Sequence, residues 1–388
     1  MAARKPGSRS FVVEARVLAR TARSCAALHP PDAVAGPAAR RNRLSAVVLL
    51  VAGAAAALPG GAFSAEPVRP RVVLISIDGL RADAVTAETA PTLAALAARG
   101  AVGTALADLP PVTMTNHASM LTGLSAATHR VYLDTDLPGT IAVPTLFDYA
   151  AAAGLRCAFL ASKDKLRYFA PPAAVETRVF ASDTAGLIDA VLPLLAPDGP
   201  DLVFIHLRDP DSAGHADGWL SPAYLAAVAR VDDHVARLTA ALARDLRPRS
   251  EASPAEEPAP DAPGAGPRPS YLVITADHGG EGRTHVLDNA ATRRVPWIVV
   301  GPDVAAGYAF PGTVRPADTT ATVLWLLGVA VPHGLDGRAQ TLVKATLDFG
   351  PDSAQGSPSA APRPALAPPC FLVAAPLLAA LAGRRRSA

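Results

Sequence analysis

The sequence predicts an α/β protein with a doubly wound, mostly parallel sheet and helices on both faces of that sheet. Between about residues 70 and 345, continuous apolar runs rich in β-branched residues alternate with alanine- and leucine-rich runs of helical periodicity. Aspartate or histidine directly follows several of the apolar runs. The alternation is typical of βαβ units, and sheets of this kind bind their ligands beyond the carboxyl ends of the strands.

The expected strands are apolar on both faces, as parallel strands are when helices cover both sides of a sheet. They are residues 72–77, 157–162, 202–207, 271–276 and 297–300, which read VVLISI, CAFLAS, LVFIHL, YLVITA and WIVV. A helix is expected at 91–99, because PTLAALAAR opens with proline and is followed by glycine. Further helices are expected within 221–246 and from the polar residues 113–117 onward.

The compact domain is expected to span residues 66–345, and the segment before it has the order of a secretory signal. Nine basic residues against two acidic ones lie before position 44, and the apolar stretch 44–65 ends in small residues. We therefore expect export to the periplasm or the extracellular space. The basic arm is long for a signal, so either Met1 lies upstream of the true start or the arm is tolerated.

Three further segments are expected to lie outside the compact fold. Residues 247–270, rich in proline, alanine and acids, predict a disordered surface insertion. Residues 346–369 form a proline-rich linker, and 370–388 combine the apolar run FLVAAPLLAALAG with RRR. That last run is short for a membrane span, and we expect a membrane tether or a sorting tail.

Composition narrows the possible functions. Without the two end segments, roughly 23 basic residues face about 30 acidic ones, so the domain is mildly acidic and no nucleic-acid surface is expected. Of the three cysteines only Cys157 lies within the domain, which predicts one thiol and no internal disulfide. Aromatic residues are 5% of the chain, and the sequence reveals no nucleotide-stacking pocket.

Metal-capable residues follow three of the expected strands. They are Asp78 after the first, Asp211 and His215 after 202–207, and Asp277, His278 and His285 after 271–276. Singly, each motif could be a turn cap, an Asx turn or a loop. Jointly they bring three carboxylates and three imidazoles to one edge of one sheet, which predicts a metal site. Mixed nitrogen and oxygen ligands without cysteine suit zinc, with manganese or iron as alternatives.

Five motifs in order resemble the alkaline phosphatase superfamily, and most closely its nucleotide pyrophosphatase/type I phosphodiesterase branch. They are IDGLRAD, TMTNHASMLTG, DPDSAGH, ADHGG with a later TH, and DTTATVLWLLGVAVPHGLDGR. The resemblance covers about residues 70–340 and implies an alkaline-phosphatase-like fold. It implies a phosphodiesterase or nucleotide pyrophosphatase with two metal ions and a covalent phosphothreonine.

The same resemblance assigns roles to individual residues. Thr113 would be the nucleophile, and Asn116 would donate a hydrogen bond to a phosphoryl oxygen. One metal ion would be held by Asp78, Thr113, Asp277 and His278, and the other by Asp211, His215 and His285. Two neighbouring cations can stabilise both the attacking and the leaving oxygens of an in-line displacement. Thr115 and His117 are interpreted as packing residues, and His333 as part of a surface turn.

Several alternatives remain open at this point. Lys163 and Lys165 share the loop SKDKLRYF after the strand 157–162, where they resemble the phosphate clamp of monoesterase relatives. Such a clamp would favour phosphomonoesters, so monoesterase activity is an alternative to diesterase activity. A sulfatase is disfavoured, because Cys157 lacks the sequence context of a formylglycine nucleophile. A non-catalytic binding protein on the same scaffold would be expected to lack a ligand, and none is missing.

Overall fold

A computed structural model describes residues 68–248 and 268–341 of the chain. Its contacts divide the chain into residues Met1–Lys344 and Ala345–Ala388. The expected signal, linker and tail lie outside the described residues, as does most of the expected insertion 247–270. The last residues of that insertion belong to the fold, since Arg268 forms an ion pair with Asp201 and Ser270 begins a strand. Within the described ranges, no helix is both long and apolar enough to cross a membrane.

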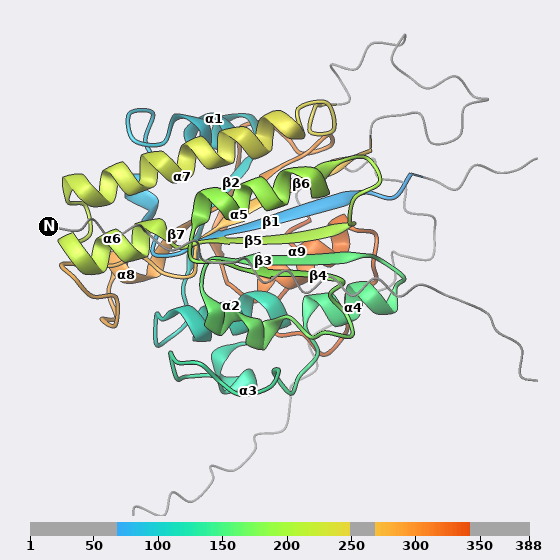
Figure 1. The fold of residues 1–388 in the computed structure, drawn as a ribbon, viewed down its shortest axis with the longest axis horizontal. Helices are drawn as coiled ribbons and strands as arrows, with labels where there is room; N and C mark the ends of the chain where they lie inside the picture. The colour runs from blue at the N-terminus through green and yellow to red at the C-terminus, as the bar shows by residue number, and fades with distance from the viewer. Residues whose placement is uncertain (1–67, 249–267, 342–388) are drawn as a thin grey trace, which may run out of the picture. The chain divides into compact units, whose positions relative to one another are not determined.

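The described residues form an eight-stranded sheet in the order β4-β3-β5-β1-β6-β7-β2-β8 (Figure 1). The strands are β1 (Arg71–Ile77), β2 (Ala101–Leu106), β3 (Cys157–Ala161), β4 (Thr177–Phe180), β5 (Leu202–Leu207), β6 (Ser270–Thr275), β7 (Arg294–Val300) and β8 (Tyr308–Val314). β1 pairs in parallel with β5 and β6, and β3 pairs in parallel with β5 and β4. The predicted doubly wound, mostly parallel sheet is confirmed.

One strand direction was wrong in the prediction. The strand expected at 297–300 lies in β7, which runs antiparallel to both of its neighbours, β6 and β2. The cause is the connection 276–293, which carries Asp277, His278 and His285 along the carboxyl edge and holds only the short helix α8 (Ala290–Arg293). With no crossover to the other end of the sheet, the chain enters β7 from the edge at which it left β6.

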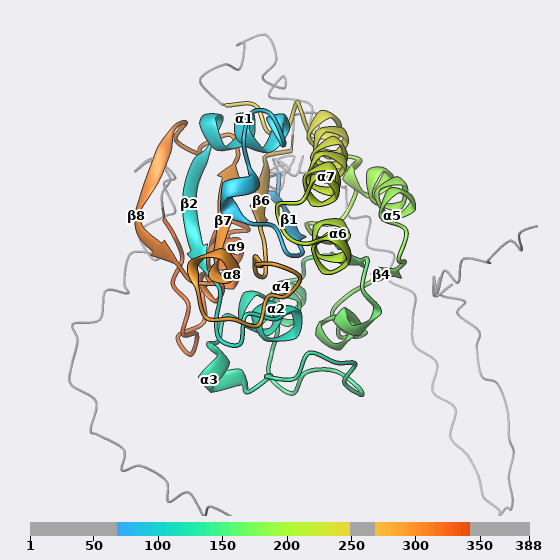
Figure 2. The same cartoon turned by 90° about the vertical axis from the view of Figure 1, so that its left-hand side faces the viewer.

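Helices cover both faces of the sheet (Figure 2). On one face lie α1 (Pro91–Arg99), α5 (Thr184–Val191), α6 (Asp209–Asp217) and α7 (Pro222–Ala241). On the other lie α2 (Thr113–Thr122), α4 (Leu146–Ala152) and α9 (Asp318–Leu326), with α3 (Ala126–His129) beside α2. Short 3-10 helices span Ala82–Ala84, Asp164–Phe169 and Leu192–Leu195. The helices expected at 91–99, within 221–246 and from 113 onward correspond to α1, α7 and α2.

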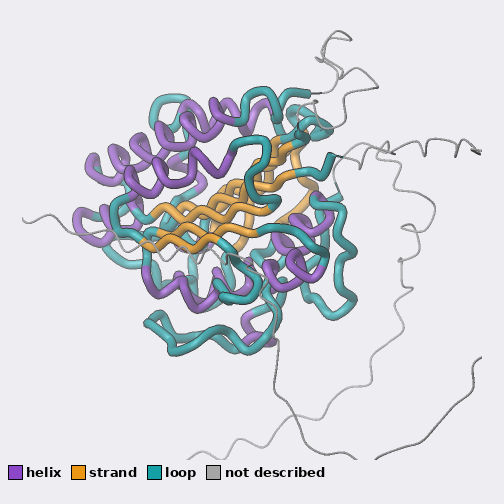
Figure 3. The backbone as a smooth tube through the Cα atoms, turned by 45° about the vertical axis from the view of Figure 1, so that its right-hand side comes forward, coloured by secondary structure: helices purple, strands orange, loops and turns teal. Residues whose placement is uncertain are grey.

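The central strands are buried over their whole length, and they form a continuous layer between the helices (Figure 3). The rings of Phe159 and Phe204 lie 4.6 Å apart between centroids, and Phe147 packs on Phe159 at 5.4 Å. Each such side chain contributes roughly 1.5–3 kcal/mol on burial. Cys157, in β3, is buried and unpaired, as predicted. The core therefore holds the carboxyl ends of β5, β1 and β6 in fixed positions side by side.

Candidate active site

The loop after β1 brings Asp78 into contact with the start of α6. Gly79 has a φ of +70°, and a Cβ added there would lie 2.9 Å from the Cα of Asp211. Glycine is required because both the left-handed backbone and the close approach exclude a side chain. The Asp211 N–H donates to the carbonyl oxygen of Asp78 at 3.1 Å. Two of the predicted metal ligands, from β1 and α6, are thus fixed to each other through the main chain.

The predicted nucleophile, Thr113, is buried at the first position of α2. The N–H of the next residue, Met114, donates to the Asp134 carboxylate at 3.1 Å, so a side chain from a separate loop caps the helix. His117, one turn on, donates its Nδ1–H to the Thr113 carbonyl at 2.8 Å, while its Nε2 contacts the Ser76 hydroxyl. The interpretation of His117 as a packing residue is consistent with these contacts, which anchor the first turn of α2 to β1.

Three histidines present the same nitrogen toward the carboxylates. His278, His285 and His215 direct Nδ1 at main-chain carbonyls, those of Gly279 at 2.8 Å, Pro111 at 2.8 Å and Arg283 at 3.1 Å. A carbonyl can only accept, so each Nδ1 carries a proton, and in the neutral imidazole the lone pair is then on Nε2. Metal-binding histidines in proteins are typically oriented by such a hydrogen bond.

The cluster contains buried polar atoms that have no hydrogen-bond partner. They are Asp78 Oδ1, Asp211 Oδ1, Asp277 Oδ2 and His278 Nε2. Leaving such groups unpaired in a protein interior costs about 1–3 kcal/mol each. Candidate ligand atoms form two groups, and within each group all the atoms lie within 4.8 Å of one another. One group is Asp78, Asp277 and His278, and the other is Asp211, His278 and His285. These unpaired, converging atoms fit a bound cation, and His278 belongs to both groups.

The predicted ligands differ in how closely they join these groups. His215 is exposed and belongs to neither group, although its Nε2 lies 3.4 Å from Asp211 Oδ1. The ring of His285 stacks on His278 at 3.8 Å between centroids. Burial, together with the neighbouring His278, lowers the pKa of His285 to about 4, so its imidazole is neutral and able to bind a cation.

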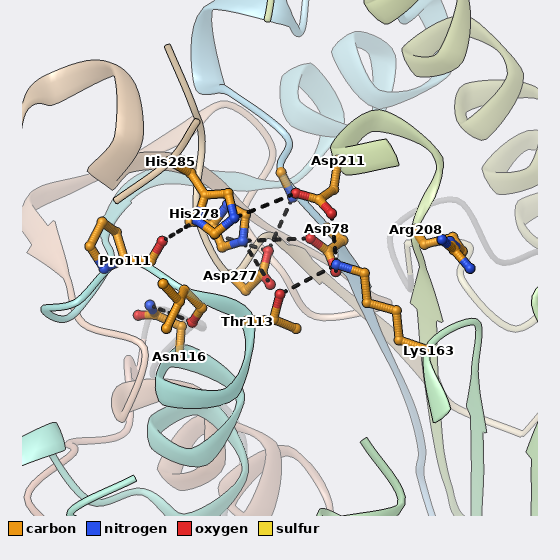
Figure 4. Close-up of polar contacts among 12 residues, drawn as sticks. Asp78, Pro111, Thr113, Asn116, Lys163, Arg208, Asp211, Asp277, His278 and His285 are labelled. Atoms are coloured by element: carbon orange, nitrogen blue, oxygen red, sulfur yellow. Dashed lines mark hydrogen bonds and ion pairs between the residues drawn. The ribbon is translucent and has the colours of Figure 1, made fainter. Parts of the chain in front are cut away.

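Lys163 reaches the centre of the cluster from the turn after β3 (Figure 4). Its ammonium lies 2.6 Å from Asp78 Oδ2, 2.7 Å from Asp211 Oδ2 and 3.4 Å from the Thr113 hydroxyl. Burial would raise the pKa of Asp78, but Lys163 and a hydrogen bond from His206 hold that pKa well below its usual range. The lysine binds the Oδ2 atoms of both carboxylates, whereas their Oδ1 atoms are the unpaired ones.

The structure separates two residues from this centre. The Lys165 ammonium forms an ion pair with Asp134 Oδ1 at 2.6 Å, and the ammonium beside Thr113 is that of Lys163. The side-chain Oδ1 of Asn116 accepts the Asp108 N–H at 2.7 Å. Its side-chain Nδ2 contacts main-chain carbonyls between 108 and 112 at 3.2–3.4 Å. Asn116 therefore shapes the loop before α2, and its hydrogen bond to a phosphoryl oxygen stays a prediction. His333 lies in an exposed turn, as expected.

Sequence reasoning missed three residues that support the site. His206 donates to Asp78 Oδ2 at 2.9 Å from within β5, where a histidine in the otherwise apolar run LVFIHL was the available signal. Asp134 caps α2, and nothing local in the sequence marks it. Trp219 donates its indole N–H to the Gly79 carbonyl at 2.9 Å and packs edge-on against His215 at 5.1 Å between centroids.

Comparison with known proteins agrees with this geometry. The model of the family "Type I phosphodiesterase / nucleotide pyrophosphatase" matches residues 72–145 and 145–289. A curated relative, the 2,3-bisphosphoglycerate-independent phosphoglycerate mutase of Natronomonas pharaonis, is 27% identical over 158 residues. That match covers 39% of this chain and 26% of the relative, so the chain spans about a quarter of the relative's length.

Solved structures share the fold at low sequence identity. Human ectonucleotide pyrophosphatase/phosphodiesterase 5 superposes with a TM-score of 0.55 and 14% identity, covering 71% of this chain and all of the other. The phosphonate monoester hydrolase of Silicibacter pomeroyi gives 0.52 and 18%, covering 70% and 76%. A putative sulfatase from Bacteroides thetaiotaomicron gives 0.52 and 17%, covering 70% and 74%. The chain belongs to the type I phosphodiesterase/nucleotide pyrophosphatase family, whose model matches more than half of it.

Proposed function

We propose that this enzyme hydrolyses phosphodiesters or nucleotide pyrophosphates through a covalent phosphothreonine at Thr113, with two divalent metal ions. The observation that carries the proposal is the position of the Thr113 hydroxyl. It lies at the start of α2, 3.4 Å from the Lys163 ammonium, which itself contacts Asp78 and Asp211. A hydroxyl next to buried cationic and metal-capable groups is a candidate nucleophile.

The donor atoms around Thr113 suit two cations, which we propose to be zinc. Asp78, Thr113, Asp277 and His278 would hold one ion, and Asp211, His215 and His285 the other. The support is the set of unpaired carboxylate oxygens, the unpaired Nε2 of His278, and the orientation of all three histidines by hydrogen bonds at Nδ1. When bound, such ions supply positive charge to the attacking and leaving oxygens of phosphoryl transfer.

The residues of the chain account for the rest of the reaction. The Thr113 oxygen bonds to phosphorus as the bond from phosphorus to the leaving oxygen breaks. Solvent takes up the Thr113 proton and supplies one to the leaving oxygen, and the N-terminal end of the α2 dipole favours the negative charge on the Thr113 oxygen. The hydrogen bond from His117 fixes the backbone of Thr113. A water oxygen then bonds to phosphorus, and the bond to Thr113 breaks, which frees the hydroxyl for the next cycle.

The test compares two threonines of the same helix. Thr113→Ala should lower turnover of methyl 4-nitrophenyl phosphate by roughly a thousandfold or more, because the covalent step needs that oxygen. Thr115→Ala is the matched control, since Thr115 is equally buried and its hydroxyl has no hydrogen-bond partner. If Thr115→Ala were inactive and Thr113→Ala were active, the nucleophile would not be Thr113.

Phosphomonoester hydrolysis is the second candidate, and Lys163 is the observation in its favour. A monoester dianion carries one more charged oxygen than a diester, so an ammonium beside the nucleophile stabilises it selectively. The geometry supports a clamp made by Lys163 alone, since Lys165 pairs with Asp134. Lys163→Ala should then lower monoesterase kcat/KM by about tenfold or more with diesterase activity little changed. Lys165→Ala is the control, and equal losses on both substrates in Lys163→Ala would remove the clamp.

We also propose that the enzyme is exported and tethered through its C-terminal segment. The support is the sequence alone, namely the basic and apolar residues before 66 and the apolar run with RRR in 370–388. Truncation after about residue 350 should release soluble, active enzyme. Full-length protein that is already soluble and unprocessed would contradict the tether, and protein retained in the cytoplasm would contradict export.

A further inference from the structure

Large exposed apolar side chains gather in the loops that carry the active-site residues. Among the described residues these side chains are Val68, Leu109, Tyr132, Leu133, Leu220, Val286 and Leu287. All but Val68 lie within two residues of a group that contacts the site. Exposed apolar clusters of this kind usually mark a binding surface.

Two of these loops meet at His285. Val286 and Leu287 follow it directly and are 60% and 47% exposed. Leu109 lies two residues before Pro111, whose carbonyl accepts the Nδ1–H of His285 at 2.8 Å. This hydrogen bond joins the two loop segments that carry Leu109, Val286 and Leu287.

A third apolar segment lies in the loop before Asp134. Tyr132 and Leu133 are 46% and 66% exposed, and Leu133 is the most exposed of the set. Asp134 receives the Met114 N–H, one residue from Thr113, so these side chains lie close to the start of α2.

Leu220 adds an apolar side chain from the α6–α7 connection. It has a φ of +64°, a left-handed backbone that non-glycine residues other than asparagine and aspartate seldom adopt. Its neighbour Trp219 contacts His215 and His285, with ring centroids 5.1 and 5.9 Å apart. An exposed leucine held in this conformation next to the site points to a role in binding.

We propose that these six side chains form an apolar rim that binds the alcohol-derived group of the substrate, so that the substrates are phosphate esters of apolar alcohols. The proposal rests on the proposed phosphate ester chemistry at Thr113. The apolar rim is defined as Leu109, Tyr132, Leu133, Leu220, Val286 and Leu287. Covering these side chains with an apolar substituent removes their surface from water and so favours binding.

The charges between the rim residues favour a small substrate over a membrane surface. Cytoplasmic-leaflet and bacterial membrane surfaces are anionic and attract clusters of lysine and arginine. Apart from the candidate ligand Asp277, the loops of the apolar rim carry more acidic than basic residues, namely Asp108, Asp134, Asp136, Glu281 and Asp288 against Arg130 and Arg283. Such a surface repels anionic headgroups, whereas one alkyl or aryl group attached to a phosphate fits the apolar side chains.

The experiment measures binding instead of turnover. Zinc-supplied, full-length Thr113→Ala protein is titrated calorimetrically with methyl, butyl and hexyl phosphate. A fully buried methylene tightens binding about fourfold, so half burial predicts hexyl phosphate to bind roughly thirtyfold more tightly than methyl phosphate. Adding Leu133→Ser and Leu287→Ser should reduce that ratio at least about threefold. Val68→Ser is the matched control, because Val68 is 44% exposed at the opposite end of β1.

Equal affinities for the three alkyl phosphates, no binding of any of them, or an unchanged ratio in the rim variant would overturn the rim. The proposal would also be overturned if the rim variant lost binding to phosphatidylserine vesicles while its ratio of hexyl to methyl phosphate affinity stayed unchanged. The rim would then bind a membrane and not the substrate. Failure of the proposed function is seen separately, as absence of ester hydrolysis by the wild-type protein. The chain-length ratio is a binding measurement that needs no turnover, so the two failures are observed in separate experiments.

Discussion

Replacing Lys163 with methionine should destabilise the protein far more than the same change at Lys165. The ammonium of Lys163 lies 2.6 and 2.7 Å from two buried carboxylates, and its side chain is only 15% exposed. Removing one partner of a buried ion pair leaves an uncompensated charge and costs about 3–5 kcal/mol. Lys163→Met keeps most of the apolar stem, so we expect a loss near the lower end, about 3 kcal/mol.

Lys165 provides the control because its partner carboxylate, Asp134, is 31% exposed, whereas the two partners of Lys163 are 0% and 5% exposed. Ion pairs of that kind contribute about 0–1 kcal/mol. Urea unfolding followed by circular dichroism, on chelator-treated protein at pH 7.5, measures both variants. A loss below about 1 kcal/mol for Lys163→Met, or equal losses for the two variants, would refute the view that Lys163 neutralises the carboxylate cluster.

Three further predictions concern the supports of the site. Burial lowers the pKa of His117 to about 4, from about 6.5 in the unfolded chain. The unfolded chain alone therefore takes up this proton between those values, and stability present above pH 6.5 is lost as the pH falls toward 4, by up to about 3 kcal/mol. His117→Asn should flatten that slope in urea unfolding of chelator-treated protein, and an unchanged slope would contradict the assignment. Gly79→Ala should abolish activity and destabilise the fold by more than about 2 kcal/mol, because the added Cβ would lie 2.9 Å from the Asp211 backbone. Gly139→Ala is its control, with a φ of +73° and no atom within 4 Å of the added Cβ, and should cost only about 1 kcal/mol; similar losses at both positions would count against the close approach. Thr113→Ala should keep at least one zinc ion per chain by elemental analysis, since three ligands of the first ion remain, and a metal-free variant would show that Thr113 is indispensable for binding.

The central strands could be predicted because burial dictates their composition. LVFIHL and VVLISI coincide with β5 and β1 apart from one residue at the start of β1. The direction of β7 could not be predicted, because an antiparallel strand that is covered on both faces is as apolar as a parallel one. The missing information was the path of 276–293, which depends on how the loop folds around His278 and His285.

The candidate ligands were predictable because polar residues that follow apolar strands must lie at one edge of the sheet. The different ion-pair partners of Lys163 and Lys165 could not be predicted, because both lysines belong to one short loop. Only the folded shape of that loop, with the 3-10 helix Asp164–Phe169, separates them. The contacts of the Asn116 amide with main-chain carbonyls of the loop before α2 were not predicted, and its contact with substrate stays a prediction. Side-chain hydrogen bonds of this kind depend on backbone positions that the sequence does not state.

The most direct test of the account is a metal titration coupled to activity. Chelator-treated full-length protein is supplied with zinc in steps, and bound metal, by elemental analysis after desalting, is compared with the turnover of methyl 4-nitrophenyl phosphate. The proposed two-metal site predicts that activity rises until two ions per chain are bound, and that Asp211→Asn retains one ion and loses activity. Full activity in protein that binds one ion or none would contradict the two-metal site.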